Sequence, residues 1–223
     1  MLKRLLIVSP DFHGYWKAVA SAFESIGYSV RVHRYDSHTT FADRVQNKLL
    51  HDLPESLRSR AAAEKATLRA VEQLRGESFD AVLVIKGDQL GEAWWEALSA
   101  ESVPSVIWLY DEIRRTRYTP EFLASTGRIA SYSHGDVRLL REHGADAVFV
   151  PLGFDSSQSF VRVEVPAVTL VGARYPNREQ LGRGIQGSGV PVRADGRDWS
   201  RRLSDVVRTR RFRAAGVPAS GDL

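Results

Sequence analysis

The chain has 223 residues, a formal net charge of +4 and a hydrophobic fraction of 43%. This length accommodates one large domain, or one domain and part of another. It contains no cysteine, which excludes disulfides, cysteine-ligated zinc and a thiol nucleophile. The apolar run Leu5–Val8 stops at Ser9-Pro10 and is too short for a signal peptide or a membrane span. We therefore expect a cytoplasmic protein without a membrane span.

The charge is unevenly distributed. From Gly172 to the end, eleven arginines stand against five acids, a net +6, which leaves −2 for residues 1–171. A basic end can bind nucleic acid, but no interleaved aromatics and no known reader motif accompany it, so nucleic acid is the least favoured partner. Phosphate groups of a small ligand, or a coding bias toward arginine, explain the charge equally well.

Strand and helix patterns alternate along residues 1–150. The first apolar run predicts a buried strand, and helical spacing follows from Tyr15 to Ile26, where Gly27 ends the helix. Further strands are expected at 28–33, 80–85, 104–109, 128–132 and 147–150, and helices at 40–50, 54–74, 92–98 and 136–143. This alternation predicts an α/β fold with a Rossmann-like, doubly wound parallel sheet.

The same pattern begins again after the sixth strand, but it is short. Residues 168–171 and 191–194 are expected to form strands around a helix at 178–186, and an Arg-rich tail follows. We therefore predict an N-terminal Rossmann-like domain over 1–155, a linker over 156–166, and an incomplete second Rossmann-like domain over 167–223.

Polar residues follow the strands of the first half. The carboxyl ends of parallel strands gather along one edge of a sheet, which is a common place for a ligand cleft. The residues expected to line this cleft are Asp11, His13, Gly14, Lys86, Asp88, Asp111, Glu112, Ser133, His134, Gly153 and Asp155.

Three of these residues are candidate catalytic groups. His13 lies in a loop and titrates near neutrality, so it is a candidate general base, or else a solvent-facing or capping histidine. Asp111 is a candidate for orienting a hydroxyl or acting as a base, or it pairs with the arginines that follow it. Asp11 has the same candidate roles, or it caps the next helix. His134 is better interpreted as a cap-region residue.

The stretch from Gly172 to Arg178 predicts a phosphate site. A strand runs into a glycine and a helix then begins, so that free amides and the helix dipole favour an anion. Arg174 and Arg178 can add bidentate contacts, with Tyr175 and Asn177 beside them. The pattern is neither a Walker A loop nor GxGxxG. A plain strand-to-helix turn with surface arginines is the alternative.

Five segments together resemble CgeB-like (spore-maturation-type) glycosyltransferases: LLIVSPDFHGYW, WLYDE, FVPLGFD, VGARYPNR and VPVRADGRDW. The resemblance covers residue 4 to about residue 200, and VGARYPNR and GRDW are its most specific parts. It implies a GT-B enzyme that transfers a sugar from a UDP- or GDP-sugar to an acceptor, with no metal and no further cofactor. On this basis Asp11, His13 and Asp111 face the acceptor.

The resemblance also implies that Gly172, Arg174, Asn177 and Arg178 approach the donor phosphates. Relatives in that family continue beyond GRDW with an acidic motif for the donor, and this sequence departs from the pattern there. We therefore expect a truncated donor domain, with loss of activity as an open alternative.

A non-catalytic Rossmann-like binding module is the alternative function. An incomplete second sheet would leave open edges and apolar surface, which predicts either a homodimer or poor solubility. A receiver domain is excluded, because its acidic pair after the first strand is missing.

Overall fold

The computed structural model describes residues 2–36, 55–155, 166–196, 198–199 and 220–222, with backbone alone at 13, 55–60 and 220–222. The predicted helix at 40–50 lies outside these residues. The chain divides into two compact units, Met1–Ser157 and Gln158–Leu223, and each is described by itself below.

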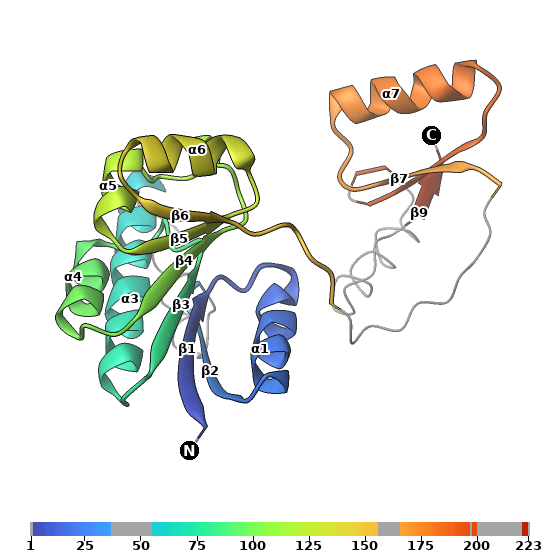
Figure 1. Ribbon diagram of the computed structural model, residues 1–223. Coiled ribbons are helices and arrows are strands. Elements are labelled where there is room, and N and C mark those ends of the chain that lie inside the picture. The colour runs from blue at the N-terminus through green and yellow to red at the C-terminus, as the bar shows by residue number, and fades with distance from the viewer. Residues whose placement is uncertain (1, 37–54, 156–165, 197, 200–219, 223) are drawn as a thin grey trace. The chain divides into compact units, whose positions relative to one another are not determined.

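The first unit is built on a six-stranded, fully parallel sheet (Figure 1). Its strands lie in the order β2-β1-β3-β4-β5-β6. They are β1 (Lys3–Ser9), β2 (Tyr28–Arg34), β3 (Ala81–Ile85), β4 (Ser105–Leu109), β5 (Arg128–Ser131) and β6 (Asp146–Phe149). The predicted α/β class with a parallel sheet is confirmed.

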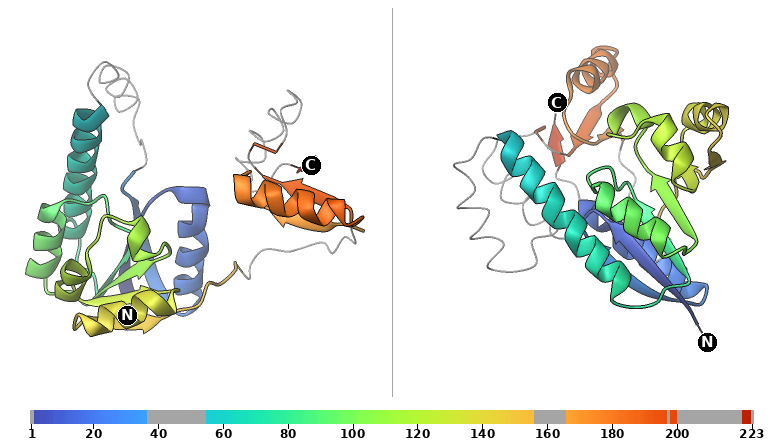
Figure 2. Two further views of the ribbon diagram at one scale, coloured as in Figure 1. Left: turned by 90° about the horizontal axis from the view of Figure 1, so that it is seen from above. Right: turned by 90° about the vertical axis from the view of Figure 1, so that its left-hand side faces the viewer.

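Helices cover both faces of this sheet (Figures 1 and 2). The connection from β1 leads to β2 at one edge of the sheet, whereas the later connections lead the opposite way, to β3 and on toward β6. Because each crossover is right-handed, connections that run in opposite directions along the sheet lie on opposite faces. One face therefore carries α1 (Tyr15–Ser25), and the other carries α3 (Glu55–Arg75), α4 (Glu92–Ala100), α5 (Pro120–Ser125) and α6 (His134–Glu142). The sheet is doubly wound, as the alternating pattern predicts.

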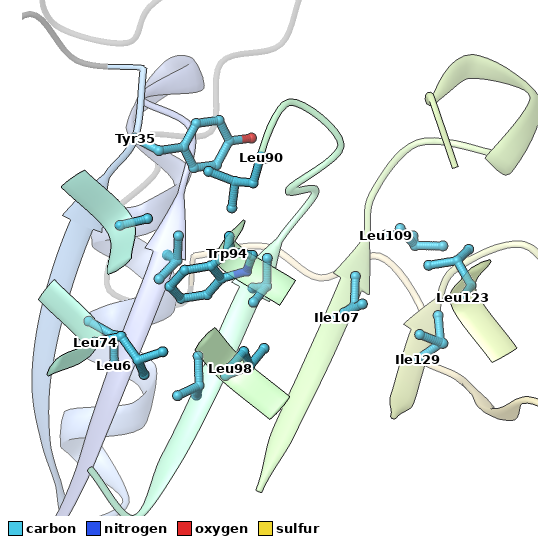
Figure 3. Close-up of a cluster of buried hydrophobic side chains, with 14 of the residues drawn as sticks. Leu6, Tyr35, Leu74, Leu90, Trp94, Leu98, Ile107, Leu109, Leu123 and Ile129 are labelled. Atoms are coloured by element: carbon cyan, nitrogen blue, oxygen red, sulfur yellow. The ribbon is translucent and has the colours of Figure 1, made fainter. Parts of the chain in front are cut away.

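The core follows from the alternation of side chains along buried strands. Leu5 and Ile7 of β1 pack on the α1 side, whereas Leu6 and Val8 pack on the side of α3 and α4. On that second side the indole of Trp94 is fully buried between the sheet and the helices (Figure 3). Truncation of such a side chain to alanine costs about 3–5 kcal/mol, so α4 is firmly fixed to the sheet.

Three short elements were not predicted. The 3-10 turns η1 (Phe12–Gly14) and η3 (Ile113–Arg115) follow β1 and β4. Helix α5 begins at Pro120, and the hydroxyl of its N-cap residue Thr119 accepts a hydrogen bond from the Phe122 amide at 3.2 Å. Such a Thr-Pro pair is a helix start signal, although the helix that follows it is only six residues long.

The second unit contains β7 (Val168–Val171), α7 (Pro176–Gly187), β8 (Val192–Asp195) and β9 (Ser220–Asp222). β7 and β8 are parallel and are joined through α7, as predicted. The helix begins two residues earlier than expected, because Pro176 occupies its first turn. β9 pairs with β8 in the antiparallel direction and comes from the Arg-rich tail, where no strand was expected.

Candidate functional site

The strand order places the predicted polar residues along one edge of the first sheet. Asp11 follows β1, Lys86 and Asp88 follow β3, Asp111 and Glu112 follow β4, and Ser133 and His134 follow β5. Because β1, β3, β4 and β5 are neighbours in the sheet, consecutive clusters lie beside one another.

Lys86 and Asp111 form the central contact of this edge. The Lys86 Nζ lies 2.9 Å from the Asp111 Oδ2, and both side chains are about three-quarters buried, with 22% and 23% of their surface exposed. The Arg115 guanidinium reaches the other oxygen of Asp111 at 3.9 Å. The ammonium of Lys86 also lies over the Tyr110 ring, 5.8 Å from its centroid. Asp111 thus pairs with one of its following arginines, but mainly with Lys86.

The turn after β3 has an unusual backbone. Lys86 and Gly87 both have positive φ, 62° and 73°, and a lysine in this region stores on the order of 1 kcal/mol of strain. Two tyrosines fix the turn: the Tyr118 hydroxyl donates to the Lys86 carbonyl at 2.7 Å, and the Tyr35 hydroxyl accepts from the Gly87 amide at 3.4 Å. Strain that is held in place by surrounding contacts is typical of functional sites.

These tyrosines serve as hydrogen-bonding groups and not as bases. Burial raises the pKa of Tyr35 and of Tyr118 far above the usual range for a phenol, and nearby Asp88 adds to the rise in both cases. Burial likewise raises the pKa of Tyr110, with Asp111 as the next cause. All three hydroxyls therefore stay protonated at neutral pH. The sequence patterns did not assign them a role, although Tyr35 and Tyr110 stand directly after strands; Tyr118 lies nine residues beyond the end of β4.

The loop after β1 meets the end of β4 through aromatic rings. Phe12 stacks on Tyr110 with ring centroids 6.3 Å apart and an angle of 12° between the planes. Asp11 accepts hydrogen bonds from the Trp16 indole at 2.9 Å and from Arg34 at 3.1 Å. Asp11 therefore holds α1 and β2 to the loop, while its side chain makes no cap bond.

Two further predicted residues belong to this loop. Gly14 adopts a left-handed conformation with φ of 70° at the start of α1, which suits a residue without a β-carbon. The side chain of His13 lies outside the described part of the structure, so its role as a base stays a prediction.

The end of β5 is organised by helix capping. Ser133 is the N-cap of α6, and its hydroxyl accepts from the Asp136 amide at 3.2 Å. His134 is the first helical residue, and its ring stacks on Phe149 with centroids 3.8 Å apart. Asp136 also accepts from the Ile113 amide at 3.0 Å, which ties the segment after β4 to α6.

The remaining cleft candidates lie around these clusters. Glu112 pairs with Arg114 at 2.5 Å. Asp88 accepts the Arg117 amide at 3.3 Å through one carboxylate oxygen. Gly153 is exposed and Asp155 is half-buried in the segment that follows β6.

In the second unit, the two predicted phosphate-binding arginines both have partners within the chain. Arg174 makes a two-point contact with the Glu179 carboxylate, at 2.9 and 2.7 Å, and Arg183 shares the same carboxylate at 2.5 Å. Arg178 donates to the Ala173 carbonyl at 2.9 Å and lies over the ring of Tyr175, 5.3 Å from its centroid.

The other predicted residues of this turn lie around the helix start. Asn177 caps the amide of the next residue with its side-chain oxygen at 2.9 Å. Tyr175 is the N-cap of α7 without a side-chain cap bond. Ligand contacts at all of these positions stay predictions.

The turn from β7 into α7 is closed by the GRDW segment. The Trp199 indole donates to the Gly172 carbonyl at 2.6 Å, and the Gly172 amide donates to the Asp195 carbonyl at 2.7 Å. A β-carbon on Gly196 would overlap the Gly172 carbonyl, and a β-carbon on Gly172 would overlap the Arg178 guanidinium. Both glycines also have positive φ. Gly196 is therefore required by close approach to backbone as well as by conformation, whereas Gly172 is required mainly by its positive φ, because the Arg178 guanidinium is the end of a flexible side chain.

Within the described residues, no group of three His, Asp or Glu side chains is placed to hold a metal ion. The same residues contain no helix with the length and apolar character that a membrane crossing requires.

The fold and the strand-end edge define an α/β protein with a Rossmann-like parallel sheet. No model of a known protein family matches the chain, and no curated protein matches it. Among solved structures it is similar to Arabidopsis thaliana UGT89C1 complexed with UDP-L-rhamnose, with 16% identity, a TM-score of 0.47, and coverage of 86% of this chain and 64% of that chain. It is also similar to UGT89C1 complexed with quercetin, with 15% identity, a TM-score of 0.48, and coverage of 86% and 57%. The chain thus spans less than two thirds of the length of those structures.

Proposed function

We propose that the chain is a GT-B-type glycosyltransferase of the CgeB-like kind, which takes a sugar from a UDP- or GDP-sugar and passes it to an acceptor hydroxyl. The observation that carries this proposal is the contact between Trp199 and Gly172, because it joins the two most specific segments of the sequence resemblance into one turn. That turn leads directly into the start of the 12-residue helix α7, where backbone amides and the helix dipole favour a phosphate.

In the proposed reaction the acceptor oxygen forms a bond to the anomeric carbon while the bond from that carbon to the diphosphate breaks. The leaving diphosphate keeps the electron pair, and the acceptor proton passes to a base. Arg174, Arg178 and the amides at the start of α7 would stabilise the negative charge that develops on the diphosphate. Binding there requires Arg174 to exchange part of its contact with Glu179 for the ligand.

The choice of base follows from the partners of the two carboxylates. Asp111 already accepts Lys86, and Asp11 already accepts Trp16 and Arg34. A substrate hydroxyl that approached either carboxylate would have to displace one of these partners. We therefore assign the general base to His13, and assign Asp111 the role of holding Lys86 at the strand-end edge.

A thermal-shift or calorimetric titration of the full chain with UDP, GDP and their sugars tests the donor site. A ligand that binds the native state raises its melting temperature by mass action. A free ligand concentration of about 100 times Kd adds about 2.7 kcal/mol to the free energy of unfolding. We expect a nucleotide-dependent rise that is lost in Arg174→Ala with Arg178→Ala. The matched control is Arg183→Ala, which removes a different partner of Glu179 one turn further along α7 and should retain the shift. Absence of a shift with every nucleotide would overturn the proposal.

A non-catalytic binding module is the second candidate function. It is favoured by the pairing of both candidate carboxylates, because groups that are engaged in structural contacts are poor catalysts without rearrangement. Sugar release from the nucleotide-sugar, measured for the unaltered chain and for His13→Gln, separates the two. Turnover that disappears in His13→Gln while nucleotide binding persists supports the enzyme. Binding without turnover in the unaltered chain supports the binding module.

A further inference from the structure

A groove separates α4 and α5 on the first unit, and one of its ends adjoins the strand-end edge at Asp88, Arg117 and Tyr118. Its volume is about 980 Å³, and it extends from Asp88 and Arg117 at the carboxyl edge of the sheet to Ser105 and Gly127 at the opposite edge. β4 and β5 run beneath it between these edges, and these strands have five and four residues. The groove is therefore about as long as these strands. At about 3.3 Å per residue, its length is on the order of 16 Å.

The groove arises because α5 is short. Helix α4 has nine residues and α5 has six, so at 1.5 Å per residue α5 is about 5 Å shorter than its neighbour. Much of the connection from β4 is used by the 3-10 turn at 113–115 and by the segment that carries Tyr118. The flank of α4 that faces α5 is therefore left open along part of its length.

One face of α4 forms one wall of the groove, and Phe122 of α5 together with Tyr118 forms the other. Glu92, Trp95, Glu96 and Ser99 follow the spacing that places residues on one face of α4. From the other side Phe122 stacks on Tyr118 with centroids 5.5 Å apart and an angle of 7°. Trp95 meets both rings edge-on, at 6.0 Å from Tyr118 and 5.5 Å from Phe122. The three rings are half-buried and give the groove an apolar aromatic wall.

The charge of this groove is opposite to that of the whole chain. The protein carries a net +4, whereas acids outnumber basic residues in the lining of this groove. Among the described residues that line the groove, Asp88, Glu92 and Glu96 are acidic and Arg117 is the basic one. Glu92 and Glu96 are exposed and lie one turn apart beside Trp95. The surface is therefore complementary to a cation that also carries apolar groups.

Asp88 places a carboxylate oxygen without a hydrogen-bond donor at the end of the groove that lies at the carboxyl edge of the sheet. Its Oδ2 accepts the Arg117 amide, whereas its Oδ1 is buried and has no hydrogen-bond partner among the described residues. A buried carboxylate oxygen without a donor costs free energy, so the negative charge of Asp88 is incompletely compensated at this end of the groove.

We propose that this groove binds an extended, cationic segment of a partner protein. Arginine or lysine side chains of the segment would lie between Glu92, Glu96 and Asp88, and its apolar side chains would pack on Phe122 and on Trp95, whose indole also attracts cations. A segment of about five residues spans the length of the groove. The proposal concerns a surface of the first unit and does not depend on the proposed sugar transfer.

Fluorescence anisotropy with the full chain tests this proposal. The probe is a labelled nine-residue peptide of alternating arginine and leucine with blocked termini, and its counterpart has glutamate in place of each arginine. We expect the arginine peptide to bind, and the glutamate peptide not to bind. Raising the ionic strength from about 0.1 M to about 1 M shortens the Debye length from about 10 Å to about 3 Å, and should weaken the interaction.

Two double variants locate the binding. Glu92→Gln with Glu96→Gln removes two charges from the groove. This double variant should lower the affinity for the arginine peptide about five-fold, which corresponds to the loss of two exposed ion pairs. The matched control, Glu24→Gln with Glu142→Gln, removes two charges from the exposed surfaces of α1 and α6 and should leave the affinity unchanged. Phe122→Ser should weaken the peptide as well, by loss of apolar contact.

Several results would overturn the proposal. These are no binding of the arginine peptide, equal loss of affinity in both double variants, or equal binding of the glutamate peptide. Binding of a neutral oligosaccharide such as maltohexaose, lost in Phe122→Ser but kept in Glu92→Gln with Glu96→Gln, would assign the groove to glycans instead. Nucleotide titrations of the groove variants should match those of the unaltered chain, so failure here is distinguishable from failure of the proposed donor site.

Discussion

The indole of Trp199 donates a hydrogen bond to the carbonyl of Gly172 across 27 positions of sequence, at 2.6 Å. Gly196 packs against the same carbonyl so closely that it has no room for a β-carbon. A strand end, a glycine turn and a tryptophan therefore form one unit, and the backbone path from β7 into α7 depends on all of them. This dependence leads to a first prediction.

Trp199→Phe should loosen the turn without unfolding the first unit. The change keeps most of the apolar surface but leaves the Gly172 carbonyl without its indole donor, which costs about 1 kcal/mol. Amide hydrogen exchange should become faster in Val168–Val171 and Val192–Asp195, while β1 and β3 keep their protection. Gly196→Ala should have a larger effect in the same segments, and unchanged exchange in both variants would contradict this account of the turn.

Gly87→Ala should be strongly destabilising. Gly87 has φ of 73°, and a β-carbon there would lie 2.5 Å from Val84 Cγ1 and 2.8 Å from the Tyr118 hydroxyl. Gly144 is the matched control, since its φ is 83° but no atom lies within 4 Å of the position that an added methyl group would take. We expect Gly144→Ala to cost about 1 kcal/mol from conformation alone, and Gly87→Ala about 2–4 kcal/mol, because overlap is added. Urea unfolding measures both, and equal costs would contradict the role of close approach.

The parallel sheet was predictable because its strands are buried on both faces and read as continuous apolar runs, such as Leu5–Val8. Helix α5 was missed because six residues with one buried side chain, Leu123, give no periodic signal. β9 was missed for a different reason: a three-residue strand in a basic tail exists through its pairing with β8, a contact that local sequence does not encode.

Lys86 and Asp111 should be energetically coupled. Their side chains are largely withdrawn from water and meet at 2.9 Å, so each loses a partner when the other is removed. A double-mutant cycle with Lys86→Gln and Asp111→Asn should give a coupling energy of roughly 1 kcal/mol, above that of an exposed pair. The exposed pair Arg128 and Asp146, with 59% and 57% of their side chains accessible, is the control and should give a smaller value. A coupling of zero for Lys86 and Asp111 would contradict their structural role.

The gathering of polar residues at one edge was predictable from the alternation of strands and helices, and the contact between Lys86 and Asp111 agrees with it. The tyrosines that organise this edge were not. Tyr118 stands nine residues after the end of β4, and it reaches the Lys86 carbonyl through the fold of the intervening segment. Its role depends on a non-local hydrogen bond, and periodicity carries no information about such a bond.

His33 should make stability depend on pH on the acid side. Burial lowers the pKa of His33 from 6.5 to about 4, and the positive charges of Arg69 on α3 and Arg34 on β2 act in the same direction. In the unfolded chain the His33 ring therefore becomes protonated near pH 6.5, whereas in the folded chain it becomes protonated only near pH 4. Stability from this group is complete above pH 6.5 and is lost as the pH falls toward 4.

Replacing this residue tests the prediction directly. A full shift is worth about 1.4 kcal/mol per pKa unit, but the ring is only part-buried, so we expect a loss on the order of 1–2 kcal/mol between pH 6.5 and pH 4. His33→Gln should remove this part of the acid-side slope, as measured by urea unfolding at a series of pH values. NMR titration of the His33 ring protons gives the pKa independently, and a midpoint near 6.5 in the folded chain would contradict the assignment.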